Sequence, residues 1–420
     1  MPRIVLSLLF ILAFSSAASD VSARQPLTLV HALEGVPRWE LEQLAGRFNK
    51  SQAEFRLVTL YRALPDHARA DLALVADAMT ADLLARRAVQ PLWQILAQAG
   101  ARTDTRFIPA VASSFADEKG RLLALPLTPS TPLLYYNRDA FRKAKLDPRQ
   151  APRTWYEMPA WMEKLAEAGS ACPLTTTFPA WILLENMAAW HNQAIATHDN
   201  GMDGEDARLA FNGHLMVRWI GMLASWQKSG YFSYSGRTDE AEARFASGEC
   251  AMLTSSSASY AALRVRSRFE LGAAHLPFYD DLPGAPQNTL AGGSALWALA
   301  GAPKDSARGI AKFAAWLLRA DVQAEWHQRT GYAPLTLAAY ELTRRKGFYQ
   351  AHPAQDIALG QLLARAPTVN SRGVRLAGLP FIRSIVNEEL ESVWNGKKTP
   401  IDALNQAVLR GNALLYPGQD

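Results

Sequence analysis

The order of apolar segments in the first quarter of the chain constrains the fold most. Residues 27–33 have the pattern of a buried strand, and apolar residues recur at helical spacing over 39–48. Strand patterns follow at 55–61 and 72–76, and a helical pattern covers 80–88. Strands that alternate with helices at these lengths are typical of α/β layers around a mostly parallel sheet. We therefore expect an α/β fold.

The length of 420 residues predicts two domains, because one domain commonly has about 100–200 residues. Further strand patterns at 133–137, 250–254, 269–275 and 295–299 are separated by helical patterns, and no internal repeat interrupts them. Two α/β units joined by more than one crossing segment would leave a cleft between them. Small ligands usually bind in such clefts.

The first 23 residues have the features of a secretory signal peptide. A short basic start is followed by the apolar run 4–14 and by Val21-Ser22-Ala23, a peptidase site with small residues at the critical positions. The run is too short for a permanent membrane-spanning helix. No cysteine follows the cut, so a lipid anchor there is not expected. The sequence predicts an exported, soluble protein.

Charge and motifs argue against several classes of function. The net charge of +5 is mild, and its basic residues are scattered, whereas a nucleic-acid binder would show a basic stripe. The sequence has no G-x-S-x-G, H-E-x-x-H, Walker-type or G-x-G-x-x-G motif, and its eight His show no metal-site spacing. We therefore expect no metal, no cofactor and no enzyme activity.

The two cysteines, Cys172 and Cys250, lie far apart in sequence. A cysteine pair in an oxidising compartment is more often bridged than free. Nothing in the sequence shows whether the two side chains lie close together, so a disulfide remains open.

Two small-residue segments are candidate ligand contacts. The hydroxyl-rich run 254–259 follows a strand and opens a helix, which directs free backbone N–H groups towards one point. The run can receive a phosphate or sugar hydroxyls, or one serine can simply cap the helix. Gly292-Gly293 allows a ligand to approach the main chain, or forms a tight turn.

Longer stretches resemble a known family. Residues 125–141, LPLTPSTPLLYYNRDAF, are similar to the first lobe crossing in solute-binding proteins of ABC importers, extracellular solute-binding protein family 1. The similarity continues through Thr154-Trp155, Trp181 and 248–252 to the specific stretch 388–400, EELESVWNGKKTP. It covers nearly the whole mature chain and is greatest to the periplasmic members that bind sn-glycerol 3-phosphate.

This resemblance implies a two-lobed periplasmic binding protein fold of type II, like that of maltose-binding protein, with a hinge that closes the lobes on a ligand. The N-terminal lobe would comprise 24–131 with 292–337, and the C-terminal lobe 132–291 with 338–420. The implied partners are ABC permease subunits with a cytoplasmic ATPase, and the protein would be a monomer. The implied ligand is sn-glycerol 3-phosphate or a glycerophosphodiester such as glycerophosphocholine. A neutral oligosaccharide or polyol is the alternative.

The resemblance also implies a set of ligand contacts: Asp77, Ser130, Trp155, Trp181, Ser256, Gly293, Tyr332 and Arg383. A guanidinium suits a phosphate because it is always charged and presents a planar fork of donors. Arg383 could instead pair with a nearby acid, and Trp155 and Trp181 could belong to the core. Ser130 and Asp77 could instead cap helices. The expected effect of replacing Arg383 by Ala is lost binding with little change in melting temperature.

The chain departs from the family after Tyr61. Only residues 62–70 stand where the family has a full helix with a second ligand-contacting tyrosine, and Tyr61 does not replace that residue. The shorter segment should open one side of the cleft and allow a larger ligand.

Overall fold

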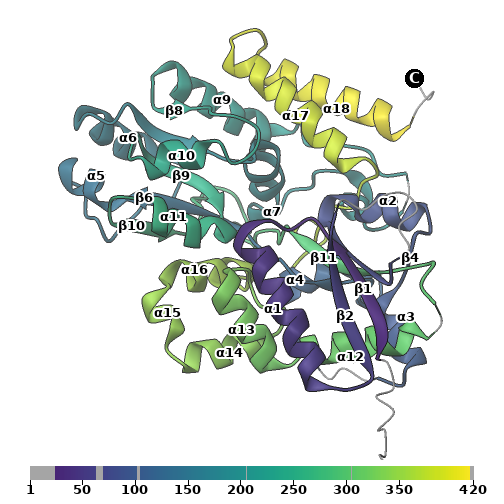
Figure 1. Cartoon of the computed structure of the whole chain (residues 1–420). Helices are drawn as coiled ribbons and strands as arrows, with labels where there is room; N and C mark the ends of the chain where they lie inside the picture. The colour runs from purple at the N-terminus through teal and green to yellow at the C-terminus, as the bar shows by residue number, and fades with distance from the viewer. Residues whose placement is uncertain (1–23, 63–69, 102–104, 205, 304, 417–420) are drawn as a thin grey trace, which may run out of the picture.

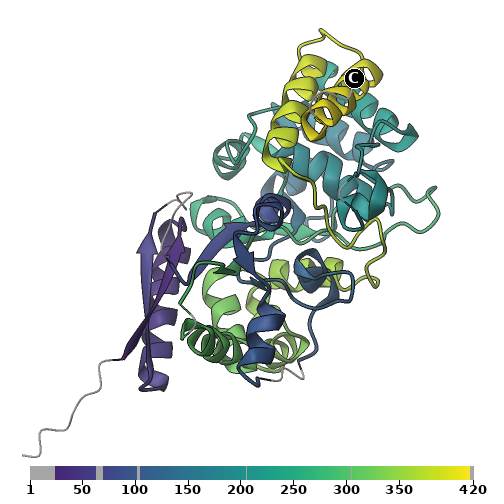
Figure 2. The ribbon, with the colours of Figure 1, turned by 90° about the vertical axis from the view of Figure 1, so that its right-hand side faces the viewer.

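The computed structural model describes residues 24–62, 70–101, 105–204, 206–303 and 305–416, which form two α/β units with one sheet each (Figure 1). The predicted signal peptide lies outside the described residues. In the side view, β1, β2 and α1 form one edge of the molecule and the C-terminal helices lie at the opposite end (Figure 2).

The N-terminal sheet has the strand order β2-β1-β3-β11-β4, and β5 pairs with β11. Its strands are β1 (Gln25–His31), β2 (Phe55–Tyr61), β3 (Leu72–Ala76), β4 (Val89–Gln90), β5 (Leu125–Pro126) and β11 (Ser294–Leu299). Strand β1 is parallel to β2 and β3, whereas β11 is antiparallel to β3, β4 and β5.

The C-terminal sheet has the order β10-β6-β9-β7-β8. Its strands are β6 (Pro132–Asn137), β7 (Cys172–Thr176), β8 (Phe232–Ser233), β9 (Cys250–Ser256) and β10 (Leu271–Ala274). Strand β6 is antiparallel to both neighbours, while β7 is parallel to β8 and β9. The prediction of a mostly parallel sheet was therefore wrong, since both sheets are mixed. In the N-terminal sheet the antiparallel pairs all involve β11, which re-enters that sheet from the other lobe.

Helices cover both sheets. Those of the first unit are α1 (Gly35–Ser51), α2 (Thr80–Ala85), α3 (Leu92–Gln98), α4 (Pro109–Ala112), α12 (Ser306–Leu317), α13 (Ala320–Thr330), α14 (Leu337–Arg345) and α15 (Phe348–Ala351). Those of the second are α5 (Arg138–Lys143), α6 (Met158–Glu167), α7 (Met187–Trp190), α8 (Thr197–Gly201), α9 (His214–Lys228), α10 (Ala241–Ala246), α11 (Tyr260–Arg266), α17 (Leu379–Trp394) and α18 (Pro400–Leu415). Helix α16 (Pro353–Leu362) contacts elements of both, namely α4 and β10.

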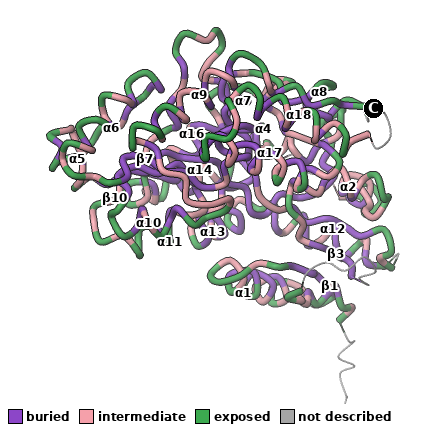
Figure 3. The backbone as a smooth tube through the Cα atoms, turned by 90° about the horizontal axis from the view of Figure 1, so that it is seen from above, coloured by how far each residue is buried: buried purple, intermediate pink, exposed green. Residues whose placement is uncertain are grey.

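Each unit has its own apolar core, and buried backbone fills the interior while exposed residues lie on the outer helices (Figure 3). In the first core Phe48 of α1 packs edge-on against Phe313 and Trp316 of α12, with ring centroids 5.0 and 5.5 Å apart. Within the described ranges, no helix is long and apolar enough to cross a bilayer.

Three described segments connect the two units. The first lies between β5 and β6, the second between β10 and β11, and the third between α16 and α17. At the first two, Ser130 and Gly292 exchange backbone hydrogen bonds of 2.9 Å. In the third, the guanidinium of Arg375 donates to the carbonyl of Ala116 at 2.8 Å, while its backbone N–H donates to Asn200 at 2.9 Å. The lobe boundaries remain a prediction. Helix α14, placed by that prediction in the C-terminal lobe, packs against α13 of the first unit.

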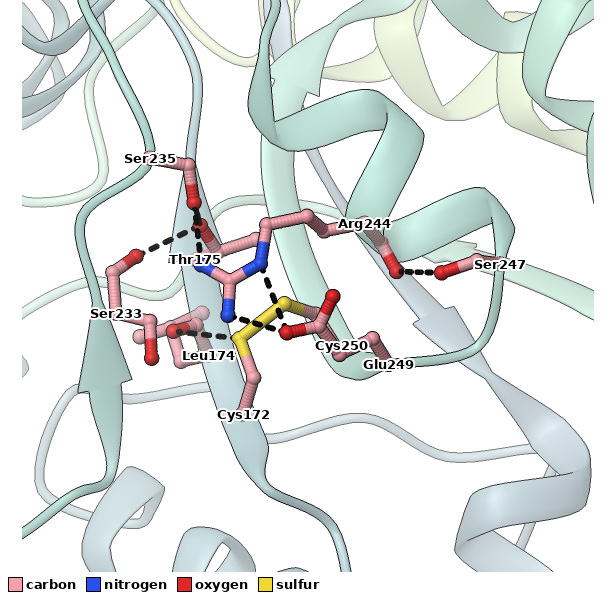
Figure 4. Close-up of a disulfide and its surroundings, with 9 residues drawn as sticks. All are labelled: Cys172, Leu174, Thr175, Ser233, Ser235, Arg244, Ser247, Glu249 and Cys250. Carbon is pink, nitrogen blue, oxygen red and sulfur yellow. Dashed lines mark hydrogen bonds and ion pairs between the residues drawn. A yellow bond between two sulfur atoms is a disulfide. The ribbon is translucent and has the colours of Figure 1, made fainter.

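A disulfide joins Cys172 and Cys250, which begin the neighbouring parallel strands β7 and β9 (Figure 4). Both cysteines are fully buried, and their Cα atoms are 4.4 Å apart. Arg244 of α10 lies over the bridge and donates to Glu249 at 3.0 Å and to Ser235 at 2.8 Å. The bridge thus ties together the two strands whose other ends lead towards the space between the lobes.

Candidate functional site

A cavity of about 570 Å³ lies between the two units. Its volume is within the range of about 300–1,000 Å³ that is common for small-molecule sites. The first unit contributes Leu33, Asp77, Thr128, Ser130, Gly292, Gly293, Ser294 and Tyr332. The second contributes Phe178, Ala180, Trp181, Arg237, Asp239, Glu242, Ser256, Ala258, Ser259, Pro380, Arg383 and Asn387. Seven of the eight predicted contact residues line this cavity.

The wall of the first unit depends on Gly293. Its φ of +126° lies in a region that L side chains rarely adopt, and a Cβ there would lie 2.0 Å from the carbonyl oxygen of Thr128. The carbonyl of Gly293 accepts from the backbone N–H of Asp77 at 2.7 Å. Asp77 follows β3 and opens a short 3₁₀ turn, so the glycine fixes where this carboxylate enters the cavity wall.

Trp181 of the second unit packs against the backbone of Gly292. A Cβ on Gly292 would lie only 2.9–3.1 Å from three atoms of the indole ring, so glycine makes this close contact possible. Trp181 belongs to a π-helical segment, Ala180–Asn186, a rare form that is frequent at functional sites. The tryptophan is half-buried and lines the cavity beside Phe178.

Ser256 ends strand β9 and both caps the following turn and lines the cavity. Its hydroxyl accepts from the backbone N–H of Ala258 at 3.2 Å, which confirms the capping alternative for the serine run. The neighbouring Ser257 hydroxyl accepts from the backbone N–H of Thr131 at 3.1 Å and ties the turn to β6. Three members of the run line the cavity: Ser256, Ala258 and Ser259.

Arg383 lies on the first turns of α17 and forms a two-point ion pair with Glu185. Its Nε and Nη2 atoms lie 2.6 and 2.7 Å from the two carboxylate oxygens. Burial alone would lower the pKa of this guanidinium, but the charge and hydrogen bonds of Glu185 raise the pKa above its ordinary value. Asp77 of the other unit lies 3.7 Å from Nη2. The alternative that Arg383 pairs with an acid is therefore confirmed, and the same guanidinium lines the cavity.

Tyr332 lies in the loop after α13. Its carbonyl accepts from Nδ1 of the buried His327 at 2.7 Å, and its ring stacks on Trp326 with centroids 6.4 Å apart. Burial raises the pKa of the Tyr332 phenol. Among the described residues no side chain or backbone group hydrogen-bonds its hydroxyl. That hydroxyl therefore remains available to a ligand.

Trp155 does not line the cavity, and the prediction that it contacts the ligand requires correction. The side chain is only 3% exposed and belongs to the core of the second unit. Its ring packs on Trp219 at 4.3 Å and near Trp226 at 6.5 Å. Trp155 packs with the two tryptophans of α9 in one apolar cluster, and its side chain therefore lies in the core and not in the cleft.

Tyr61 also lies away from the cavity lining. It is 46% exposed, its hydroxyl donates to Glu34 at 2.8 Å, and the guanidinium of Arg38 lies 4.1 Å from its ring centre. The predicted loss of a helix after this residue falls on positions 63–69, outside the described residues.

The sequence interpretation missed several polar residues of the cavity wall, among them Arg237 and Asn387. Asn387 lies one turn after Arg383, and Glu391 lies one turn further along α17. Glu391 holds Arg237 by two hydrogen bonds of 2.7 and 2.6 Å. The four-residue spacing of Arg383 and Asn387, both of which line the cavity, was the available indication that this face of α17 is turned towards it.

The cavity carries more carboxylates than guanidinium groups. Asp77, Asp239 and Glu242 line it together with Arg237 and Arg383. In the part of the chain that the structure describes, no three His, Cys, Asp or Glu side chains form a group able to hold a metal ion. The arrangement offers hydrogen-bond donors, acceptors and aromatic rings to a small polar ligand.

The family model for bacterial extracellular solute-binding proteins matches residues 52–356. The sn-glycerol-3-phosphate-binding periplasmic protein UgpB of Yersinia pseudotuberculosis is 41% identical over 418 residues, which cover 96% of this chain and 94% of that protein. UgpB of Salmonella typhimurium is 42% identical over 424 residues, covering 98% and 96%.

Solved structures share the fold. The structure of UgpB from Mycobacterium tuberculosis in complex with glycerophosphocholine has a TM-score of 0.77 at 20% identity and covers 93% of this chain and 98% of that chain. The cyclic α-maltosyl-1,6-maltose binding protein from Arthrobacter globiformis has a TM-score of 0.75 at 19% identity, covering 94% and 100%. The two-lobed fold, the cavity between its lobes and the extent of these matches show that the chain belongs to the bacterial extracellular solute-binding proteins.

Proposed function

We propose that this protein is the periplasmic solute-binding component of an ABC importer and captures sn-glycerol 3-phosphate or a glycerophosphodiester such as glycerophosphocholine. The ligand binds in the cavity between the lobes, the lobes close around it, and the complex delivers it to the permease. The curated relatives named for sn-glycerol 3-phosphate, which match nearly the whole chain, support this assignment.

The observation that carries the proposal is the position of Arg383. The guanidinium comes from one lobe, while Ser130, Tyr332 and the backbone of Gly293 come from the other, and all four line the same cavity. A hydrogen bond to a charged partner contributes about 1.5–3 kcal/mol. Arg383 and a few hydroxyl or backbone donors are therefore sufficient for micromolar affinity for a phosphate.

A neutral oligosaccharide or polyol is the second candidate. The guanidinium of Arg383 is already paired with Glu185 and approached by Asp77, which reduces its attraction for an anion. In that case Trp181 stacks on the sugar and Arg383 has a structural role.

Calorimetry with sn-glycerol 3-phosphate, glycerophosphocholine and maltose separates the candidates. The proposal expects micromolar binding of at least one glycerophosphate and none of maltose, and the reverse pattern overturns it. Recovery of the bound ligand unchanged after prolonged incubation is expected for a binding protein, whereas hydrolysis would indicate an enzyme. Mass spectrometry of the molecule that co-purifies with the protein provides an independent identification.

A further inference from the structure

We infer that Asn186 is a positioning residue, which couples the second connecting segment to two side chains of the cavity, Trp181 and Arg383. Asn186 is 0% exposed and is not among the described residues that line the cavity, so it would act on a ligand only through its neighbours. The inference rests on the proposed function only in so far as a ligand binds in this cavity. It assigns a role to a residue outside the predicted contact set.

The side-chain amide of Asn186 bridges two segments of the chain. Its Oδ1 accepts from the backbone N–H of Leu290 at 2.9 Å, and its Nδ2 donates to the carbonyl of Trp181 at 3.1 Å. Leu290 is buried and belongs to the second connecting segment, whereas Trp181 belongs to the π-helical segment Ala180–Asn186. A buried backbone donor that loses its partner is costly, so the amide holds the two segments at a fixed separation.

Three consecutive residues of the second connecting segment are held by three different elements. The Ser371 hydroxyl of the third connecting segment donates to Oδ1 of Asn288 at 2.7 Å. The Thr131 hydroxyl of the first connecting segment donates to the hydroxyl of Thr289 at 2.5 Å. These two bonds join connecting segments to one another, while the bond of the next residue leads to Asn186 and the cavity wall. A rotation of the lobes about these segments would therefore reach the cavity wall through Asn186.

The π-helical segment that ends at Asn186 holds both cavity side chains. The indole of Trp181 packs against the backbone of Gly292, in the same connecting segment that Asn186 contacts. Glu185, the residue before Asn186, holds the guanidinium of Arg383 by hydrogen bonds of 2.6 and 2.7 Å. Because one short segment fixes both groups, a shift of its last residue displaces both from the positions that a ligand would meet.

A double-mutant cycle separates this role from a purely structural one. Calorimetry with sn-glycerol 3-phosphate, glycerophosphocholine and maltose is performed on the wild type, Asn186→Ala, Trp181→Phe and the double variant. The matched control is Asn137→Ala, because Asn137 is 6% exposed and its Oδ1 accepts from two backbone N–H groups of α5 at 2.9 and 3.0 Å. Asn137 is likewise not among the described residues that line the cavity. Urea unfolding shows that each variant is folded, and Asn186→Ser replaces Asn186→Ala if that variant does not fold.

We expect Asn186→Ala to weaken binding of the ligand that the wild type binds most tightly by about tenfold. The loss should be no more than about threefold when Trp181 is already replaced by Phe, since the two residues act on the ligand together. Both Asn186→Ala and Asn137→Ala should unfold at lower urea concentration, because each loses two hydrogen bonds. Asn137→Ala should nevertheless keep the ligand affinity within about twofold of the wild type.

Three results would overturn the inference without contradicting the proposed function. They are equal fold losses in the two backgrounds, unchanged affinity in Asn186→Ala, and an equally large loss of affinity in Asn137→Ala. If the wild type binds maltose and neither glycerophosphate, the proposed function fails, and the same cycle measured with maltose decides the inference. If the wild type binds none of the three ligands, the proposed function and the inference both fail.

Discussion

The guanidinium of Arg383 and the carboxylate of Glu185 form a planar two-point pair in which Nε and Nη2 each lie within 2.7 Å of an oxygen. The Glu185 side chain is only 5% exposed, so removal of the arginine leaves a buried carboxylate without its partner. Loss of one partner of a buried ion pair commonly costs about 3–5 kcal/mol.

Arg383→Ala should therefore lower the free energy of unfolding by about 3–5 kcal/mol as well as abolish binding of a glycerophosphate. The sequence alone suggested an unchanged melting temperature, and the ion pair with Glu185 corrects that expectation. The double variant Arg383→Met/Glu185→Leu should regain much of the stability without regaining binding. Urea unfolding and calorimetry measure the two effects. A single variant as stable as the wild type would show that the pair does not stabilise the fold.

The sequence predicted the strands of the fold better than it predicted the side-chain contacts of the site. Strands β2 and β3 have the predicted bounds, because continuous apolar runs between polar residues are a local property. The acid that pairs with Arg383 could not be identified, since Glu185 is 198 residues away and only the tertiary fold brings it close. Trp155 and Trp181 are both tryptophans in apolar contexts. Trp155 packs against Trp219 in the core, whereas Trp181 packs against Gly292 at the cavity. Only the tertiary structure reveals this difference.

The two tryptophans should therefore respond differently to substitution. Trp155→Phe removes ring contacts in a closed cluster and should lower stability by about 1–3 kcal/mol with ligand affinity unchanged. Trp181→Phe should weaken ligand binding with a smaller effect on unfolding, since Trp181 is half-buried at the cavity. Calorimetry and urea unfolding on both variants give the comparison. Weaker binding in Trp155→Phe at unchanged stability would place that residue in the site instead.

The backbone at Gly293 should tolerate no side chain. Gly293→Ala introduces a Cβ at 2.0 Å from the Thr128 carbonyl oxygen in a conformation with φ of +126°. We expect a loss of about 2–6 kcal/mol in unfolding free energy, because the strained backbone costs about 1–3 kcal/mol and the steric overlap about 1–3 kcal/mol more. Gly301→Ala is the matched control, because no atom lies within 4 Å of its Cβ position. Near-equal stability of the two variants would show that this turn relaxes without cost.

The disulfide should stabilise the second unit without contributing to ligand contact. The bridged cysteines are 78 residues apart, and closing a loop of that length stabilises a fold by about 4 kcal/mol in the chain-entropy model. The variant Cys172→Ala/Cys250→Ala should therefore unfold at lower urea concentration. Its ligand affinity should stay near that of the wild type, because neither cysteine lines the cavity. An equal unfolding free energy with and without the bridge would contradict this role.

Two buried histidines should make the fold sensitive to acid. Burial lowers the pKa of His191 and of His327 to about 4, and both side chains are hydrogen-bonded through both ring nitrogens. Between about pH 6.5 and pH 4 the unfolded chain binds protons that the folded protein excludes, so stability falls as the pH falls through this window. The loss should reach about 3 kcal/mol for each histidine by pH 4.

Urea unfolding at intervals from pH 7 to pH 4 measures this dependence. The variant His191→Gln/His327→Gln is expected to be less stable at pH 7, because Gln does not reproduce both hydrogen bonds of either ring. Its stability should nevertheless decline less steeply towards pH 4, since the two titrating groups are absent from both the folded and the unfolded chain. An equally steep decline in this variant would assign the acid sensitivity to other groups. His327 also holds the Tyr332 carbonyl at 2.7 Å, so ligand affinity should fall in His327→Gln but not in His191→Gln.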